Sequence, residues 1–96
     1  MNIIEKEIRF ENFMEVLVDE ALEDLFKVTS LHFCRCERCY LDAKSIALNR
    51  LPPKYIVTRT GEIYAKLDIF RNQFRVDVLK AAIEAIEIVK KNPSHL

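Results

Sequence analysis

Residues 72–91 read NQFRVDVLKAAIEAIEIVKK, and this stretch decides how the chain has to fold. On a helix five of its seven charged residues step by three or four positions and form one narrow stripe, whereas apolar residues fill most of the remaining surface. The stripe consists of Asp77, Lys80, Glu84, Glu87 and Lys91. We therefore predict a last helix from about Asp68 or Asn72 to Lys91 that must be covered on more than one side.

The elements that precede this helix can cover one of its sides. A chain of 96 residues buries little more than about 60% of its unfolded surface, so complete burial of a central helix is the less favoured alternative. The other side packs most simply on a second copy of the chain, across a twofold axis. We expect a homodimer formed through the last helix.

Two shorter helices are predicted upstream. Asn12 directly precedes apolar residues at helical spacing and Glu15 follows three positions later, which is a capping-box signature, so we expect a helix from Asn12 to about Lys27. After a loop without periodicity, a second helix is expected from about Cys39 to Asn49.

A short β-hairpin is predicted after Pro52, which ends the second helix region. Two runs rich in β-favouring residues, 55–58 and 62–67, flank a turn at 59–61. Gly61 is the only glycine, and it stands where a tight turn needs a positive φ. The alternative is that 62–67 begins the last helix.

The composition is that of one packed domain over residues 1–96, in which the structure of 1–11 is left open. The expected fold is mainly α: about three helices, a cysteine-rich loop and the short hairpin. No stretch approaches the roughly 20 apolar residues of a membrane span, and the chain does not start like a signal peptide. We therefore expect a cytoplasmic protein that does not contact membranes.

The formal net charge is +0, with 15 basic and 15 acidic residues, which argues against direct binding of nucleic acid. The charges are nevertheless segregated. Residues 1–28 carry eight acids and three bases, whereas 35–59 carry six bases and two acids. The basic segment is suited to a small anion, although it can also be an ordinary solvated face.

Cys34, Cys36 and Cys39 place three thiols within six residues, in a loop that leads into a helix. This spacing lets the sulfurs converge on one metal ion, and zinc is the usual ion of such thiolate sites. Arg35 and Arg38 can offset the negative charge of the thiolates. The alternatives are a redox-active pair, for which the surrounding βαβ pattern is missing, and three reduced thiols without a shared role.

Zinc normally takes four ligands, and the fourth is open. Asp42 lies three residues after Cys39, so it returns to the same helix face, and we slightly prefer it. His32, a water molecule or a group from another subunit are the alternatives. Asp42 can equally be an acid that stabilises the start of the helix.

The order of three motifs resembles that of a known family. The motifs are Asn12-x-Met14-Glu15-x-Leu17-Val18-x-Glu20-x-Leu22, Cys34-x-Cys36-x-x-Cys39-x-x-Asp42, and Ala47-Leu48-Asn49-Arg50-Leu51-Pro52-Pro53-x-Tyr55-x-Val57-Thr58. Together they resemble the ComFB late-competence family from about Asn12 to the last helix. The resemblance implies a small cytoplasmic bacterial dimer with bound zinc, linked by name to competence. It also implies a receptor for a cyclic dinucleotide, cyclic di-GMP in particular.

A cyclic dinucleotide has two phosphates and two purines, so its site needs cationic and planar side chains. The basic segment supplies such residues around the rigid proline pair: Lys44, Asn49, Arg50, Lys54, Tyr55 and Arg59. We expect the largest contribution from Arg50, whose guanidinium can bond a phosphate or stack on a base. Asn49 and Arg50 can also simply end the second helix, and Tyr55 can be an ordinary strand residue.

The leading hypothesis is a non-catalytic receptor that binds a cyclic dinucleotide and signals to an unknown protein partner. The alternative is a zinc-stabilised interaction module without a small ligand. An enzyme is disfavoured because the chain has no Ser/His/Asp set, no phosphate-binding glycine loop and no paired carboxylate motif.

Overall fold

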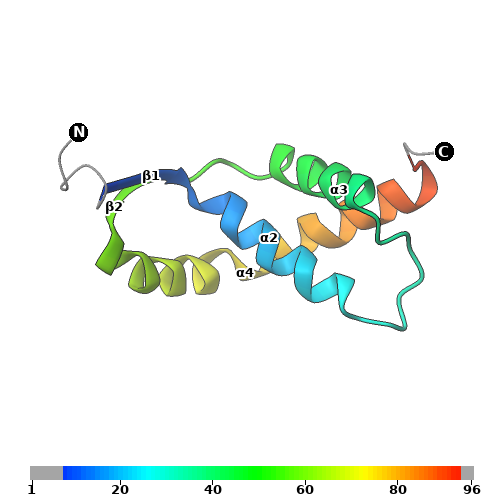
Figure 1. The fold of residues 1–96 in the computed structure, drawn as a ribbon, viewed down its shortest axis with the longest axis horizontal. Helices are drawn as coiled ribbons and strands as arrows, with labels where there is room; N and C mark the ends of the chain where they lie inside the picture. Colours follow the sequence, from blue (N-terminus) through cyan, green and yellow to red (C-terminus); the bar gives the residue numbers. More distant parts are fainter. Residues whose placement is uncertain (1–7, 94–96) are drawn as a thin grey trace.

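The computed structural model describes residues 8–93 and consists of three helices and a two-stranded antiparallel sheet (Figure 1). The elements are β1 (Ile8–Asn12), α2 (Phe13–Phe26), α3 (Glu37–Asn49), β2 (Tyr55–Arg59), the 3₁₀ turn η1 (Thr60–Glu62) and α4 (Ile63–Lys91). The predicted mainly α fold is confirmed. Over residues 8–93, no helix has the length and apolarity needed to cross a membrane.

The predicted N-cap of the first helix is present, and the same side chain also bonds the segment before β2. The Asn12 Oδ1 atom accepts hydrogen bonds from the backbone N–H of Met14 at 3.1 Å and of Lys54 at 2.7 Å. The N–H of Phe13 donates to the Lys54 carbonyl at 2.8 Å. One side chain therefore starts α2 and ties it to the segment before β2.

The predicted hairpin partner was wrong. Residues 55–59 do form a strand, but this strand pairs with β1, in a register that places Phe10 opposite Val57 and Asn12 opposite Tyr55. Of residues 1–11, whose structure the pattern left open, 8–11 therefore belong to a strand and 1–7 lie outside the described residues. The alternating sequence Ile8-Arg9-Phe10-Glu11 carried this signal.

The last helix starts five or more residues before its predicted beginning. Residues 62–67 lead into and begin α4, and Ile63 and Leu67, one helical turn apart, are buried against Phe13. This burial overrides the β propensity of the run. No residue between 8 and 93 has a positive φ. Gly61 therefore lies in the turn η1 without the positive φ that the hairpin prediction assigned to it.

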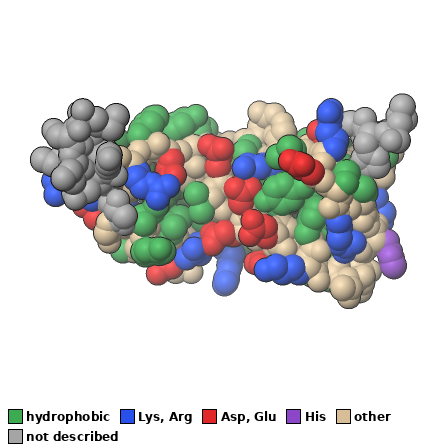
Figure 2. Space-filling view, viewed as in Figure 1, with side chains coloured by type: hydrophobic (Ala, Val, Ile, Leu, Met, Phe, Trp, Pro, Cys, Tyr) green, Lys and Arg blue, Asp and Glu red, His purple; other side chains and the backbone are tan. Residues whose placement is uncertain are grey.

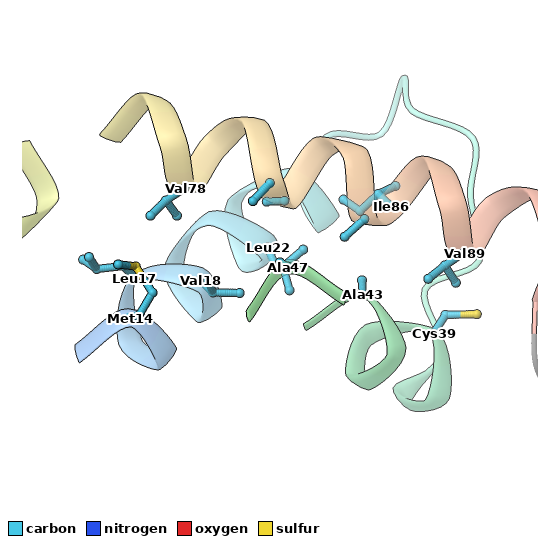
Figure 3. Packing of buried hydrophobic residues seen from close by; sticks show 13 residues of the cluster. Met14, Leu17, Val18, Leu22, Cys39, Ala43, Ala47, Val78, Ile86 and Val89 are labelled. Atoms are coloured by element: carbon cyan, nitrogen blue, oxygen red, sulfur yellow. The ribbon is translucent and has the colours of Figure 1, made fainter. Parts of the chain in front are cut away.

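The main core lies where α4 crosses α2 and α3 (Figure 3). Small residues of α4, Ala82 and Ala85, are fully buried and allow close approach of the other two helices. At the surface of this crossing, the Arg71 guanidinium of α4 donates bidentate hydrogen bonds to the Glu20 carboxylate of α2. The nitrogen–oxygen distances are 2.7–3.0 Å. This pair also raises the pKa of Arg71.

The opposite side of α4 is exposed in the protomer. Val76 is 75% exposed, and Ile69, Leu79 and Ile83 are each exposed by 40% or more. These residues follow one another at steps of seven, three and four, so they form one stripe. The last helix is therefore not completely buried within one chain.

Candidate functional site

The three cysteines converge at the start of α3. Cys36 is the N-cap of this helix, and its sulfur accepts from the backbone N–H of Cys39 at 3.4 Å. The sulfur atoms of Cys34, Cys36 and Cys39 all lie within 4.8 Å of one another. Sulfurs on one tetrahedral zinc ion are about 3.8 Å apart, as follows from zinc–sulfur bonds of about 2.3 Å, so the cluster fits zinc after small shifts.

Burial and the helix start act on these thiols in opposite directions. Burial raises the pKa of Cys39 to about 12, with hydrogen bonds to Cys36 and Cys34 adding to the effect. The Cys39 N–H lowers the pKa of Cys36, because it stabilises the thiolate. A buried thiol such as Cys39 becomes a thiolate at neutral pH only when a cation compensates its charge, so metal uptake there releases a proton.

The structure does not bring either predicted fourth ligand into this cluster. Within the described part of the chain, the group of possible ligands contains only the three cysteines. The Asp42 carboxylate accepts from Arg38 Nε at 3.3 Å, and His32 is exposed in the loop. Arg38 is thus engaged with Asp42.

Arg35 organises the loop that carries Cys34. Its guanidinium donates to four backbone carbonyls of that loop and of the end of α2, at distances of 2.6–3.2 Å. The acceptors are the carbonyl oxygens of Phe26, Val28, Leu31 and Phe33. A basic residue expected to offset thiolate charge therefore holds the loop in shape, a role that no local pattern revealed.

We predict that Arg35→Ala lowers the free energy of unfolding by about 1–3 kcal/mol, because several charge-assisted hydrogen bonds are lost together. Arg38→Ala is the matched control. It removes one exposed pair with Asp42, worth about 0.3–0.5 kcal/mol. Chemical denaturation of both variants checks the prediction, and equal effects would contradict it.

The six residues predicted to bind a ligand lie on α3, on the segment that follows it and on β2. Lys44 Nζ bonds the Asp19 carboxylate at 3.1 Å, next to Tyr40 Oη, which donates to the same carboxylate at 2.8 Å. Burial raises the pKa of Tyr40, and the hydrogen bond to Asp19 raises it further. Lys44 thus joins α3 to α2.

The end of α3 is also tied to a neighbouring helix. Arg50 donates to Glu84 of α4 at 2.7 Å, and Asn49 beside it is exposed. Lys54 Nζ lies 5.5 Å from the centre of the Phe70 ring, which is a cation–π contact. Of the six predicted residues, only Tyr55 and Arg59 lie on the two-stranded ribbon.

The outward side of this ribbon is apolar. Ile8, Phe10, Tyr55 and Val57 are exposed there, with Arg59 opposite Ile8, and we call these five residues the ribbon surface. Hydrophobic side chains gather at this end of the molecule in Figure 2, beside the acidic side chains in its middle.

Phe10 and Tyr55 form the centre of the ribbon surface. Their rings stack at 5.6 Å between centroids and 12° between planes, while Phe10 remains 71% and Tyr55 61% exposed. The inward side carries Ile56, which packs against buried residues, and two polar groups. Glu11 Oε1 and Thr58 Oγ1 are buried there without a hydrogen-bond partner among residues 8–93. The ribbon thus turns its apolar side to solvent, which is typical of an interaction surface.

Comparison with known proteins agrees with the motifs. The family described as late competence development protein ComFB matches residues 11–93. The chain belongs to the ComFB family. It is 27% identical to the competence protein ComFB of Bacillus subtilis (strain 168) over 86 residues, which is 88% of this chain and 86% of that protein.

A solved structure of the ComFB family extends this likeness to the fold. The structure of the late competence protein ComFB from Bacillus subtilis aligns with a TM-score of 0.72 at 26% identity, over 92% of this chain and 96% of that one. The ComFB match contains all the predicted site residues but begins at Glu11. Phe10, which the sequence analysis missed, lies just outside it.

Proposed function

We propose that this ComFB-family protein is a non-catalytic, cytoplasmic receptor that binds a cyclic dinucleotide, cyclic di-GMP first, and signals to a protein partner. The observation that supports it most is the stacked pair Phe10 and Tyr55 on the ribbon surface, with Arg59 on the same side. Exposed aromatic rings stack on bases, and each stacked base contributes about 1–3 kcal/mol. Arg59 offers a planar cation to a phosphate.

The ion pairs of the other basic residues support a site on the ribbon. Lys44 and Arg50 already bond Asp19 and Glu84, so a phosphate would have to replace a carboxylate there. Tyr55 needs no such exchange because its ring is exposed. The site we propose therefore differs in its centre from the one expected around Arg50.

We predict that Tyr55→Ala weakens binding of cyclic di-GMP at least about tenfold, or roughly 1.4 kcal/mol, because the stacking ring is lost. Tyr64→Ala is the matched control, since Tyr64 is 76% exposed but lies on α4. Calorimetric titration measures both affinities. A loss from Arg50→Ala that exceeds the loss from Tyr55→Ala would move the site to the end of α3.

The proposed metal is zinc, held by the sulfurs of Cys34, Cys36 and Cys39. Its role is structural, because the ion joins the loop before α3 to the first turn of this helix. A thiolate-rich site suits this role better than catalysis, for which an open coordination position and a nearby acid or base are needed.

The proposed assembly is a homodimer through the stripe formed by Ile69, Val76, Leu79 and Ile83. Leu79 also lines a groove of about 450 Å³ between α2 and α4. The rim of this groove carries acids from α2, among them Asp24, and bases from α4, among them Arg75. Charges of both signs beside one apolar stripe suit a self-complementary contact.

The second candidate function is a zinc-stabilised interaction module without a small ligand. The same groove between α2 and α4 favours it, because a largely apolar groove with charged rims also suits a protein segment. Titration with cyclic di-GMP and cyclic di-AMP separates the two functions. If folded, zinc-loaded protein gives no binding heat with either nucleotide, the result supports the interaction module.

A further inference from the structure

Cys36 and Cys39 form an adjacent pair of thiols on the first turn of α3. The Cys36 side chain folds over the helix start, since its sulfur accepts from the backbone N–H of Cys39 at 3.4 Å. The two sulfur atoms lie within 4.8 Å of each other. Residues three positions apart on a helix have Cα atoms about 5 Å apart, as the helix radius and rise require. This separation lies within the range of about 4.4–6.8 Å that a disulfide bond spans.

Solvent reaches the two thiols to different degrees. Cys39 is 2% exposed and belongs to the main core, whereas Cys36 is partly exposed. A small oxidant from solvent therefore meets Cys36 before Cys39, and the Cys39 sulfur is already in place behind it. A Cys-x-x-Cys pair at the N-terminus of a helix is a common setting for reactive cysteines.

Cys34 is the less suitable partner for Cys36, although it is exposed. It lies two residues before Cys36, in the loop that leads into α3. An extended chain advances by up to about 7 Å over two residues, which is at the limit of the disulfide range. The geometry therefore favours a bond between Cys36 and Cys39.

We propose that a hydroperoxide oxidises Cys36 and that Cys39 then closes an intramolecular disulfide bond, which makes this pair a reversible modification site. In the first step a sulfur–oxygen bond forms at the Cys36 thiolate, the O–O bond of the peroxide breaks, and hydroxide leaves. In the second step the Cys39 thiolate attacks the Cys36 sulfur, a sulfur–sulfur bond forms, and the hydroxyl group leaves as hydroxide. The two thiolates together lose two electrons, which reduce the peroxide. A dithiol reductant reverses the modification by thiol–disulfide exchange.

The disulfide would use two of the three sulfurs that we propose as zinc ligands, so its formation should release the metal. This release rests on the proposed zinc site, whereas the disulfide does not. The hydrogen bonds of Arg35 to four backbone carbonyls hold the cysteine loop without involving a sulfur atom. The fold should therefore persist when the disulfide replaces the metal.

The sequence allows the pairing to be read directly. Arg35 and Arg38 separate the three cysteines, so trypsin, which cleaves after Lys and Arg, places them on the peptides 28–35, 36–38 and 39–44. The zinc-loaded full chain is treated with hydrogen peroxide, remaining thiols are alkylated, and the digest is analysed by mass spectrometry with and without reductant. We expect peptides 36–38 and 39–44 to be linked and to separate on reduction. A chromophoric chelator should record about one Zn²⁺ released per linked chain, and circular dichroism should stay parental.

Two variants serve as controls. Cys34→Ser keeps the proposed pair and should give the same linked peptides as the parent. Cys36→Ser removes the thiol that is oxidised first but retains a residue type preferred at the N-cap, so α3 should still form. In this variant Cys39 should remain a free thiol, because it is buried.

The outcomes separate this inference from the zinc site itself. A link between peptide 28–35 and either other peptide in the parent would assign the disulfide to Cys34 and overturn the proposed pairing. Thiols that stay free, or that are oxidised without forming a link, would overturn the disulfide and leave the zinc site untouched. A parent that holds no zinc but forms the link between Cys36 and Cys39 would overturn the zinc site and support this inference.

Discussion

Cys39→Ser is expected to abolish the zinc binding that we propose and to lower the free energy of unfolding by at least about 3 kcal/mol. Structural zinc contributes about 10–16 kcal/mol of apparent binding energy in zinc-finger peptides, and loss of a buried ligand forfeits part of it. For a domain of this size the melting temperature should fall by on the order of 10 °C or more. Elemental analysis and thermal denaturation measure the two effects.

A strong chelator supplies the control for this variant. The chelator should destabilise the parent to the level of Cys39→Ser and should leave Cys39→Ser itself unchanged, since no metal remains to be removed. Reduced parent protein without bound metal, combined with a Cys39→Ser variant that melts at the parental temperature, would contradict a structural metal at this site.

Ala82→Glu is expected to unfold the protomer. Ala82 is 0% exposed where α4 crosses the other two helices, so the new carboxylate would be buried without a partner. Such a charge costs several kcal/mol, which is comparable to the whole stability of a small domain. Circular dichroism should show loss of helix.

Val76→Glu introduces the same carboxylate six residues earlier on the same helix, where the native side chain is 75% exposed in the single chain. This variant should keep the helical signal of the parent and appear as a monomer in light scattering, because the charge lies in the proposed dimer contact. A monomeric parent at micromolar concentration, or a Val76→Glu variant that stays dimeric, would contradict the dimer through this stripe.

The elements predicted correctly are those with local signals. The cap at Asn12 and the apolar pattern of the last helix depend on residues a few positions apart, and so does the spacing of the cysteines. The strand partner was missed because Phe10 and Val57 are far apart in sequence, and the β-favouring residues after Gly61 indicated a hairpin instead. Helical burial of Ile63 and Leu67 decided against that hairpin.

The partners of the candidate ligand residues could not be predicted, for a related reason. Counting basic residues identified Lys44 and Arg50, but it did not show that Asp19 and Glu84 would bond them from other helices. The sequence analysis did not identify Phe10, because only strand pairing brings Tyr55 beside it. Charge density in a segment indicates a site only when the partners of each charge are known.

The central claim is that this ComFB-family protein binds a cyclic dinucleotide. Its most direct test is calorimetric titration of the zinc-loaded full chain with cyclic di-GMP, and separately with cyclic di-AMP. The account predicts saturable binding of cyclic di-GMP with a dissociation constant of about 1 μM or tighter, which corresponds to about 8 kcal/mol. The absence of saturable heat with both nucleotides, from folded and metal-loaded protein, would contradict it.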